Sequence, residues 1–148
     1  MRSHEKAYGI VPYKIKDGDI KVLLCKSVAS KDKWGCLKGT KNKNETAHEC
    51  AKREFFEESS ISVDISLFEN YFEQINIDKD IGIWTVNANK IEGLDKYFSN
   101  ETLKSGFLSW ENSKVKFFSI DDLPRIKNKQ LTLIKEITDF LRNKNQLH

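Results

Sequence analysis

The segment WGCLKGTKNKNETAHECAKREFFEESSI, residues 34–61, determines how the rest of the chain is interpreted. It begins with a lysine-rich stretch that contains glycine, and three glutamates lie close together near its end. Residues 46–49, TAHE, form the capping-box pattern, in which a threonine caps a helix and a glutamate three positions later reaches back to the first backbone N–H. We therefore expect a helix from Ala47 to Ser59 that carries the glutamates on its last turns.

The glutamates of this helix predict a metal site. Glu54, Glu57 and Glu58 are spaced three and four residues apart, so their carboxylates project from one helix face. Like charges at this spacing repel each other, and a bound divalent cation turns the repulsion into attraction. Hard cations prefer oxygen ligands, so we expect Mg²⁺, which Mn²⁺ can replace. The alternative is a solvated acidic surface without a ligand.

The spacing of the whole segment favours the metal site over the solvated acidic surface. Gly39 is followed by five residues, Glu45, seven residues, Arg53-Glu54, apolar Phe55, one residue, Glu57-Glu58, one residue, Ser60 and apolar Ile61. This series resembles the box of the Nudix family, in which a glycine stands at the position of Ser60. The family glycine ends the helix, because a left-handed conformation is cheap for glycine. With Ser60 at this position, the sequence does not determine how the helix ends, but no predicted ligand is removed.

The resemblance implies a fold and a set of roles. The fold is α+β, with a mixed β-sheet between α-helices. The backbone carbonyl of Gly39 joins the glutamates as a metal ligand. The lysine-rich loop beside the helix start is itself suited to face the substrate phosphates, and we expect Lys38 to do so because it adjoins Gly39. Arg53 either orients a ligand glutamate or forms a surface pair with Glu57. Glu45 either supports the metal loop or is an acid favoured at a helix start.

A general base is not defined by the box alone. Some family members that cleave dinucleoside polyphosphates or RNA 5′ ends have an additional glutamate six residues before an aromatic residue of a late strand. Glu111 stands six residues before Phe117. We expect Glu111 to be an auxiliary metal ligand or the base, with an exposed loop acid as the alternative. Glu57 is the other candidate base.

The function implied by the resemblance is a Mg²⁺-dependent pyrophosphohydrolase. Its substrate is a nucleoside diphosphate linked to another group, and the dinucleoside polyphosphate or RNA 5′-end branch fits best. Trp34, before Lys38, is a candidate substrate contact or a core residue. A tyrosine typical of the dinucleoside branch is missing near Ile77 and Asp78. The alternatives are a pyrophosphatase for canonical or oxidised nucleoside triphosphates and a non-catalytic nucleotide-binding module.

Composition predicts one cytoplasmic domain covering residues 1–148. With 39% hydrophobic residues the chain can bury a single core, and a net charge of +3 is too small for a dedicated nucleic-acid binder. The three cysteines, Cys25, Cys36 and Cys50, show no disulfide or zinc spacing. No apolar run has the length of a membrane span, so we expect neither a membrane nor a disulfide partner.

The remaining elements follow from periodicity and turn residues. We expect strands over 7–15, 20–25, 61–68, 70–76, 80–88 and 114–120, with a short strand near Trp34. Asp17-Gly18 predicts a hairpin turn, and Pro12 predicts an edge or bulged strand. Residues 91–110 predict a long loop. A final helix, capped by Asp121 or Asp122, should bury the stripe Leu131, Ile134, Ile137 and Leu141.

Overall fold

The long strand β1, Glu5–Lys16, is the axis of a mixed sheet in the computed structural model, which describes residues 4–146. It pairs in parallel with β5, Lys79–Asn87, along nearly its whole length. On its other side it pairs antiparallel first with β3, Leu37–Thr40, and then with β2, Asp19–Ser27. Both faces of β1 are covered, which explains its continuous run of buried residues.

The position of Pro12 corrects one prediction. β1 is an interior strand of the sheet, so the expectation of an edge strand is wrong. The register with β3 ends at Ile10 and the register with β2 begins at Tyr13. Pro12, which has no N–H to donate, therefore falls in the gap between two partner strands.

The described residues form one sheet with the order β4-β5-β1-β2-β8-β7-β6, and β3 pairs with β1 beside this path. The strands not yet given are β4, Tyr71–Gln74, β6, Phe98–Ser99, β7, Thr102–Leu103, and β8, Asn112–Ser119. The predicted strand over 61–68 is wrong, because a short 3₁₀ helix, Ile65–Leu67, forms there. The Asp64 carboxylate accepts from the Ser66 N–H at 2.9 Å, a local bond that competes with strand pairing.

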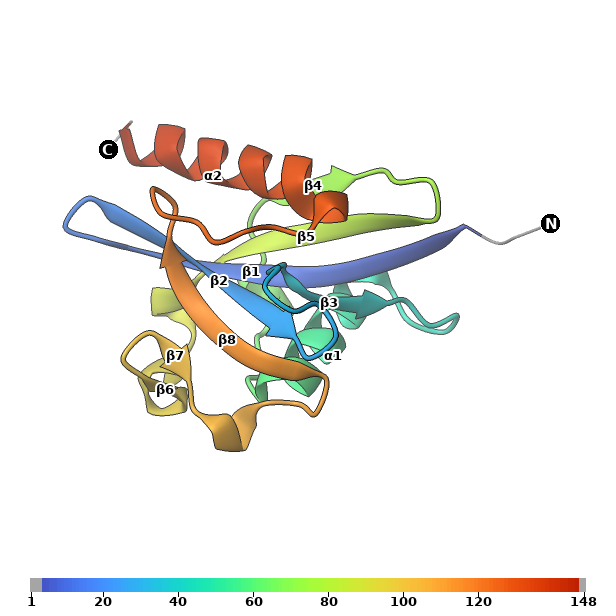
Figure 1. Ribbon diagram of the computed structural model, residues 1–148, viewed down its shortest axis with the longest axis horizontal. Coiled ribbons are helices and arrows are strands. Elements are labelled where there is room, and N and C mark those ends of the chain that lie inside the picture. The colour runs from blue at the N-terminus through green and yellow to red at the C-terminus, as the bar shows by residue number, and fades with distance from the viewer. Residues whose placement is uncertain (1–3, 147–148) are drawn as a thin grey trace.

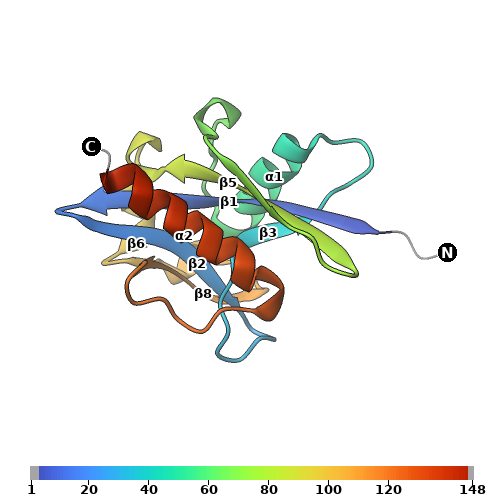
Figure 2. The same cartoon turned by 90° about the horizontal axis from the view of Figure 1, so that it is seen from above.

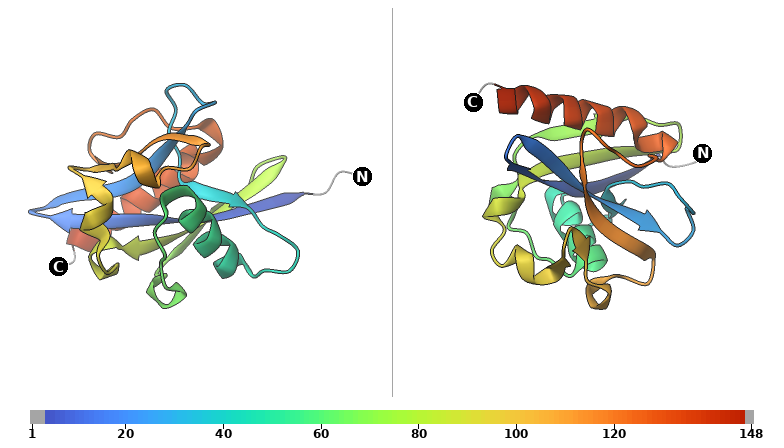
Figure 3. Two further views of the ribbon diagram at one scale, coloured as in Figure 1. Left: turned by 90° about the horizontal axis from the view of Figure 1, so that it is seen from below. Right: turned by 60° about the vertical axis from the view of Figure 1, so that its left-hand side comes forward.

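Two helices enclose the sheet (Figure 1). One face is covered by α1, Ala47–Ser59, and the opposite face by α2, Leu131–Gln146. Figure 2 shows α2 lying across the central strands, and the right-hand view of Figure 3 shows the sheet between the two helices. Each face has its own core. The α1 core includes Leu37, Cys50, Phe55, Ile61, Val86 and Phe117. The α2 core includes Val22, Leu24, Ile83, Leu133, Ile137 and Leu141.

The helix α1 has the predicted bounds and the predicted start. The Thr46 hydroxyl accepts from the Glu49 N–H at 3.1 Å, and the Glu49 carboxylate accepts from the Thr46 N–H at 2.8 Å. The helix ends at Ser60 in the left-handed conformation, with φ 66°. The Ser60 N–H donates to the Phe56 carbonyl at 2.8 Å, and its hydroxyl donates to the Phe107 carbonyl at 3.2 Å. Serine thus takes the conformation for which the family uses glycine.

The start of α2 differs from the prediction. The helix begins at Leu131, so neither Asp121 nor Asp122 caps it. The segment before it is held in backbone hydrogen bonds with Trp34, whose N–H donates to Arg125 and whose carbonyl accepts from Lys127. Leu131 is 53% exposed and Leu133 is buried in its place, whereas Ile134, Ile137 and Leu141 are buried as predicted.

Residues 91–110 are irregular, as predicted, apart from short 3₁₀ turns and the two-residue strands β6 and β7. Within residues 4–146, no helix has the length and apolar character needed to cross a membrane. The three cysteines are buried and free in this part of the chain.

Candidate active site

Arg53 is the centre of a polar network between α1 and the loop before it. Its guanidinium donates to both oxygens of Glu45, at 2.9 and 2.7 Å, and to Glu54 at 2.7 Å. Glu57, one helical turn later, lies 3.2 Å from the same guanidinium, and the Thr40 carbonyl accepts from it at 3.2 Å. The hydrogen bonds that Arg53 donates to Glu45 lower the pKa of Glu45 to about 2. Arg53 therefore connects the loop with two predicted ligands.

Gly39 lies directly against the carboxylate of Glu54. A Cβ atom at Gly39 would stand only 2.0 Å from Glu54 Oε2, so a side chain at this position would displace the carboxylate. The Gly39 carbonyl accepts from the Cys50 thiol at 3.4 Å. Burial raises the pKa of Glu54, although Arg53 opposes this effect. The backbone of β3 at Gly39 and the carboxylate of Glu54 on α1 thus meet at one point, as the spacing predicts.

Glu58 has an oxygen that no described residue satisfies. Its Oε1 accepts from Asn112 Nδ2 at 3.2 Å, while its buried Oε2 has no hydrogen-bond partner within the described chain. Burial raises the pKa of Glu58 to about 8, and the charges of Glu54 and Glu111 add to the increase. An unsatisfied buried acceptor costs about 1–3 kcal/mol. A bound cation would remove that cost.

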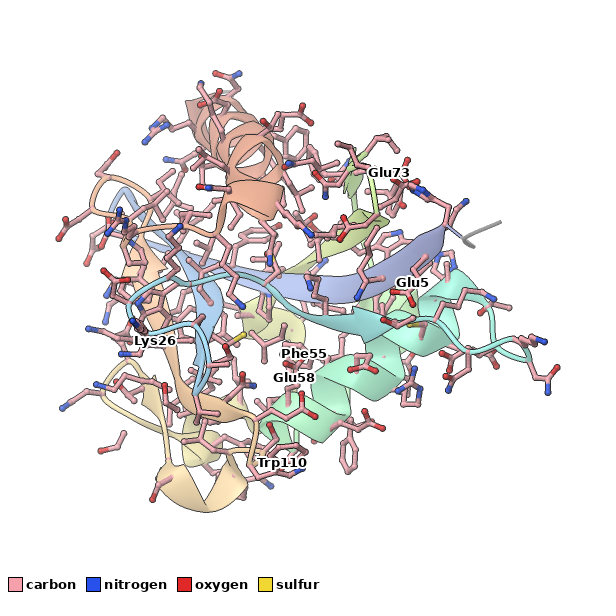
Figure 4. All side chains as sticks on the ribbon, turned by 45° about the vertical axis from the view of Figure 1, so that its right-hand side comes forward. Glu5, Lys26, Phe55, Glu58, Glu73 and Trp110 are labelled. Atoms are coloured by element: carbon pink, nitrogen blue, oxygen red, sulfur yellow. The ribbon has the colours of Figure 1, made fainter. Side chains whose placement is uncertain are left out.

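Glu111 lies in the turn before β8, and its side chain is exposed. Its backbone carbonyl accepts from the Val28 N–H at 2.9 Å, which holds the turn against the end of β2. Its charge raises the pKa of both Glu54 and Glu58, so the structure brings this predicted residue into electrostatic range of the helix glutamates. In Figure 4, Glu58 lies on α1 and Trp110, the neighbour of Glu111, lies beyond the end of that helix.

The donor set fits a hard divalent cation. Carboxylate oxygens of Glu54, Glu57 and Glu58 and the carbonyl of Gly39 are all ligands that Mg²⁺ accepts. In their present rotamers, however, no three acidic, histidine or cysteine side chains of residues 4–146 converge into a ready-made metal site. Arg53 is bonded to both Glu54 and Glu57 instead. The side chain of Glu57 is 54% exposed, and an oxygen of Glu58, one residue further on, has no hydrogen-bond partner in the described chain.

The two predicted substrate contacts have different surroundings. Lys38 is half-buried, and burial together with the charges of Lys127 and Lys79 lowers its pKa, while Glu58 acts in the opposite direction. Lys38 is therefore within electrostatic range of Glu58 and of both these lysines. Trp34 is only 8% exposed and packs edge-to-face on Phe118, with ring centroids 4.6 Å apart. The sequence left two roles open for Trp34, a substrate contact and a core residue. This placement favours the core residue.

Three contributors were not found from the sequence. Asn112 bonds to Glu58, Cys50 bonds to the Gly39 carbonyl, and Lys127 comes close enough to affect Lys38. Asn112 directly follows Glu111, which was the one available signal. The other two depend on contacts between elements that no sequence pattern marks.

Comparison with known proteins identifies the family. The family model described as NUDIX domain matches residues 4–138. The chain therefore belongs to the Nudix family, and the prediction made from the spacing of residues 39–61 is confirmed. Membership supports the predicted enzyme class, hydrolases that act on phosphoric anhydride bonds.

Solved structures show the same fold at low sequence identity. An Ap4A hydrolase from C. elegans in a binary complex is 21% identical, with a TM-score of 0.64, covering 94% of this chain and 98% of its own. The NUDIX domain of Shewanella oneidensis NrtR, complexed with ADP ribose, is 15% identical, with a TM-score of 0.68 and coverages of 95% and 90%. A mutT/nudix family protein from Listeria innocua is 15% identical, with a TM-score of 0.64 and coverages of 99% and 100%. The predicted mixed sheet between helices is confirmed.

Proposed function

We propose that this Nudix protein is a Mg²⁺-dependent pyrophosphohydrolase that cleaves a nucleoside diphosphate linked to another group. The substrate is a dinucleoside polyphosphate or the 5′ end of an RNA. The observation that carries the proposal is the unsatisfied oxygen of Glu58, a buried acceptor for a cation at the site that the family spacing marks. Glu54, one helical turn earlier, lies against Gly39 and is within electrostatic range of Glu58.

Each residue has a role in this proposal. Gly39, Glu54, Glu57 and Glu58 would hold the cation, with Glu111 as an auxiliary ligand. When bound, the cation neutralises diphosphate oxygens and lowers the pKa of a bound water. Arg53 positions its glutamate partners through the hydrogen bonds described above. Lys38 binds a substrate phosphate from the opposite side.

The reaction is a hydrolysis of one phosphoric anhydride bond. The oxygen of water bonds to phosphorus, the bridging P–O bond breaks, and the leaving phosphate keeps the bridging oxygen. Glu57 or Glu111 takes the proton that the attacking water loses. Charge stabilisation and positioning are the main protein contributions to such a transfer.

Among substrates, the similarity in fold and length to the C. elegans Ap4A hydrolase favours the dinucleoside polyphosphate reading. The missing tyrosine near Ile77 favours a second candidate, a nucleoside triphosphate pyrophosphatase for canonical or oxidised bases. Retention of Glu54, Glu57 and Glu58 argues against a non-catalytic binding module. We further propose that residues 1–148 act as one domain in the cytoplasm.

A substrate screen tests the proposal. Purified protein is incubated with dinucleoside polyphosphates, nucleoside triphosphates and a 5′-triphosphate RNA, with Mg²⁺, with Mn²⁺ and with a chelator. Products are identified by chromatography and mass spectrometry. Metal-dependent cleavage at an anhydride bond is expected, and its abolition by Glu58→Gln ties it to this site. Tight binding of nucleotides without turnover would instead support the binding module.

A further inference from the structure

A cavity of about 410 Å³ lies beside the acidic site, near the start of α2. Five lysines line it, and we call it the lysine pocket: Lys33, Lys38, Lys79, Lys127 and Lys129. The strand β3 separates the pocket from the glutamates. Thr40 shows this arrangement, because its hydroxyl accepts from Lys79 at 3.2 Å while its carbonyl accepts from Arg53 at 3.2 Å. Lys38 lies on this strand, lines the pocket and is within electrostatic range of Glu58.

The positive charge of the lysine pocket is only partly neutralised. Lys129 forms an ion pair with Asp78 at 2.5 Å, and Lys79 lies 3.5 Å from Glu5. Among residues 4–146, no carboxylate lies within ion-pair distance of the other three lysines, namely Lys33, Lys38 and Lys127. Like charges held together in a partly buried cavity destabilise each other unless an anion binds between them.

The lining of the lysine pocket also distinguishes phosphate from a nucleobase. Ile81 is its apolar lining residue, and no aromatic side chain lines the cavity in the described chain. Base recognition in proteins usually includes stacking on an aromatic ring, worth about 1–3 kcal/mol per base. A terminal phosphate offers an additional charge instead, because its second proton dissociates with a pKa of about 6. A phosphate esterified at both ends has no such second proton.

We propose that the lysine pocket holds an unsubstituted polyphosphate end of the substrate while the acidic site holds the anhydride bond that is cleaved. This inference rests on the proposed hydrolase function. Among the candidate substrates named there, it favours the RNA 5′ end and the free nucleoside polyphosphate over the dinucleoside polyphosphate. The preferred substrates are nucleoside 5′-polyphosphates, either free or at the 5′ end of an RNA. Dinucleoside polyphosphates, which carry a second nucleoside at that end, bind less well because the pocket offers lysines and no stacking surface.

The first test compares two substrates with equal numbers of phosphates, adenosine 5′-tetraphosphate and diadenosine tetraphosphate. The wild type should cleave the first with a kcat/KM at least tenfold higher. The double variant Lys33→Ala, Lys127→Ala should lose most of this preference through a higher KM, while the exposed control Lys104→Ala keeps it. A preference for diadenosine tetraphosphate, or an unchanged preference in the double variant, overturns the proposal. Parallel assays with ATP and a 5′-triphosphate oligoribonucleotide distinguish the free nucleotide from the RNA end.

The second test does not depend on turnover. Binding of inorganic tripolyphosphate is measured by calorimetry at low ionic strength in the presence of a chelator. The wild type and Lys104→Ala should bind with equal affinity, and the double variant at least tenfold more weakly. Equal binding by all three proteins, or no binding by the wild type, overturns the lysine pocket as a phosphate site. If tripolyphosphate binds as expected but the wild type cleaves no nucleotide, the proposed hydrolase function fails and the phosphate site stands.

Discussion

The guanidinium of Arg53 donates to both carboxylate oxygens of Glu45, from Nε to Oε2 at 2.9 Å and from Nη2 to Oε1 at 2.7 Å. This two-point contact joins α1 to the loop that follows β3, the strand that carries Gly39. The Asn42 N–H also donates to Glu45, at 2.9 Å, so the carboxylate holds the loop from both sides. Glu45 is thus a loop support, the first of the two roles that the sequence left open.

The Glu45 contact should make stability depend on acid pH. The folded-state pKa of about 2 lies below the ordinary value of 4.5, so the contact stabilises the fold above pH 4.5 and is lost as the pH falls toward 2. Glu45→Gln should lower the free energy of unfolding at pH 7 and show less further loss between pH 4.5 and 2. Urea unfolding at several pH values measures both effects. The exposed control Glu92→Gln should follow the wild type, and parallel curves for Glu45→Gln and the wild type would contradict the assignment.

Apart from Glu111, which the family resemblance supplied, the site could be predicted from sequence only where its residues are close in the chain. Helical periodicity places Glu54, Glu57 and Glu58 on one side of α1, and a capping box fixes where that helix starts. The family spacing adds Gly39 because the segment between Gly39 and α1 has a fixed length. Each of these inferences depends on local geometry.

Long-range contacts were beyond such reasoning. Asn112 reaches Glu58 from a strand 54 positions later, and its identity follows no periodic rule. The start of α2 was misplaced because backbone bonds to Trp34 keep residues 125–127 extended beside it, which no cap or turn residue signals. The mixed sheet between helices likewise came from the family resemblance, because strand periodicity does not determine which strands pair, and the order of the strands was not predicted.

The glutamates of α1 should control both turnover and metal binding. Glu57→Gln and Glu58→Gln are each expected to lower turnover by several orders of magnitude with the fold intact, because each removes an anionic oxygen from the proposed cation site. Mg²⁺ should raise the melting temperature of the wild type, since a ligand that binds the folded state stabilises it. Glu58→Gln should lose that increase. Near wild-type rates in both variants would rule out the site.

Glu111 should act on the proton transfer more than on folding. Its side chain is exposed, so Glu111→Gln should leave the melting temperature unchanged. If Glu111 is the base or an auxiliary ligand, the variant lowers turnover and alters the acidic limb of the pH–rate profile. Comparison of the full profiles of wild type and variant is the measurement. An unchanged rate and profile would leave Glu57 as the base.

Gly39 should tolerate no side chain. Because a Cβ would come within 2.0 Å of the Glu54 carboxylate, Gly39→Ala must displace that carboxylate or the loop. We expect loss of the Mg²⁺-dependent increase in melting temperature together with loss of turnover. Gly106→Ala is the matched control, since a Cβ there meets no atom within 4 Å. Equal Mg²⁺ responses in the two variants would show that the contact between Gly39 and Glu54 is not needed.

Ser60 should show two opposing effects on stability. Its left-handed conformation is unfavourable for a residue with a Cβ by roughly 1–2 kcal/mol. Its hydroxyl donates to the Phe107 carbonyl at 3.2 Å, a bond with a net contribution of about 0.5–1.5 kcal/mol. Ser60→Gly removes the cost of the left-handed conformation and also loses the hydrogen bond to Phe107. The stability of this variant should therefore stay close to that of the wild type. Ser60→Ala keeps the unfavourable conformation and loses the bond, so it should unfold about 1 kcal/mol more easily than the wild type. Chemical denaturation of the three proteins tests this order, and equal stabilities of the Ala and Gly variants would show that the backbone at Ser60 is not strained.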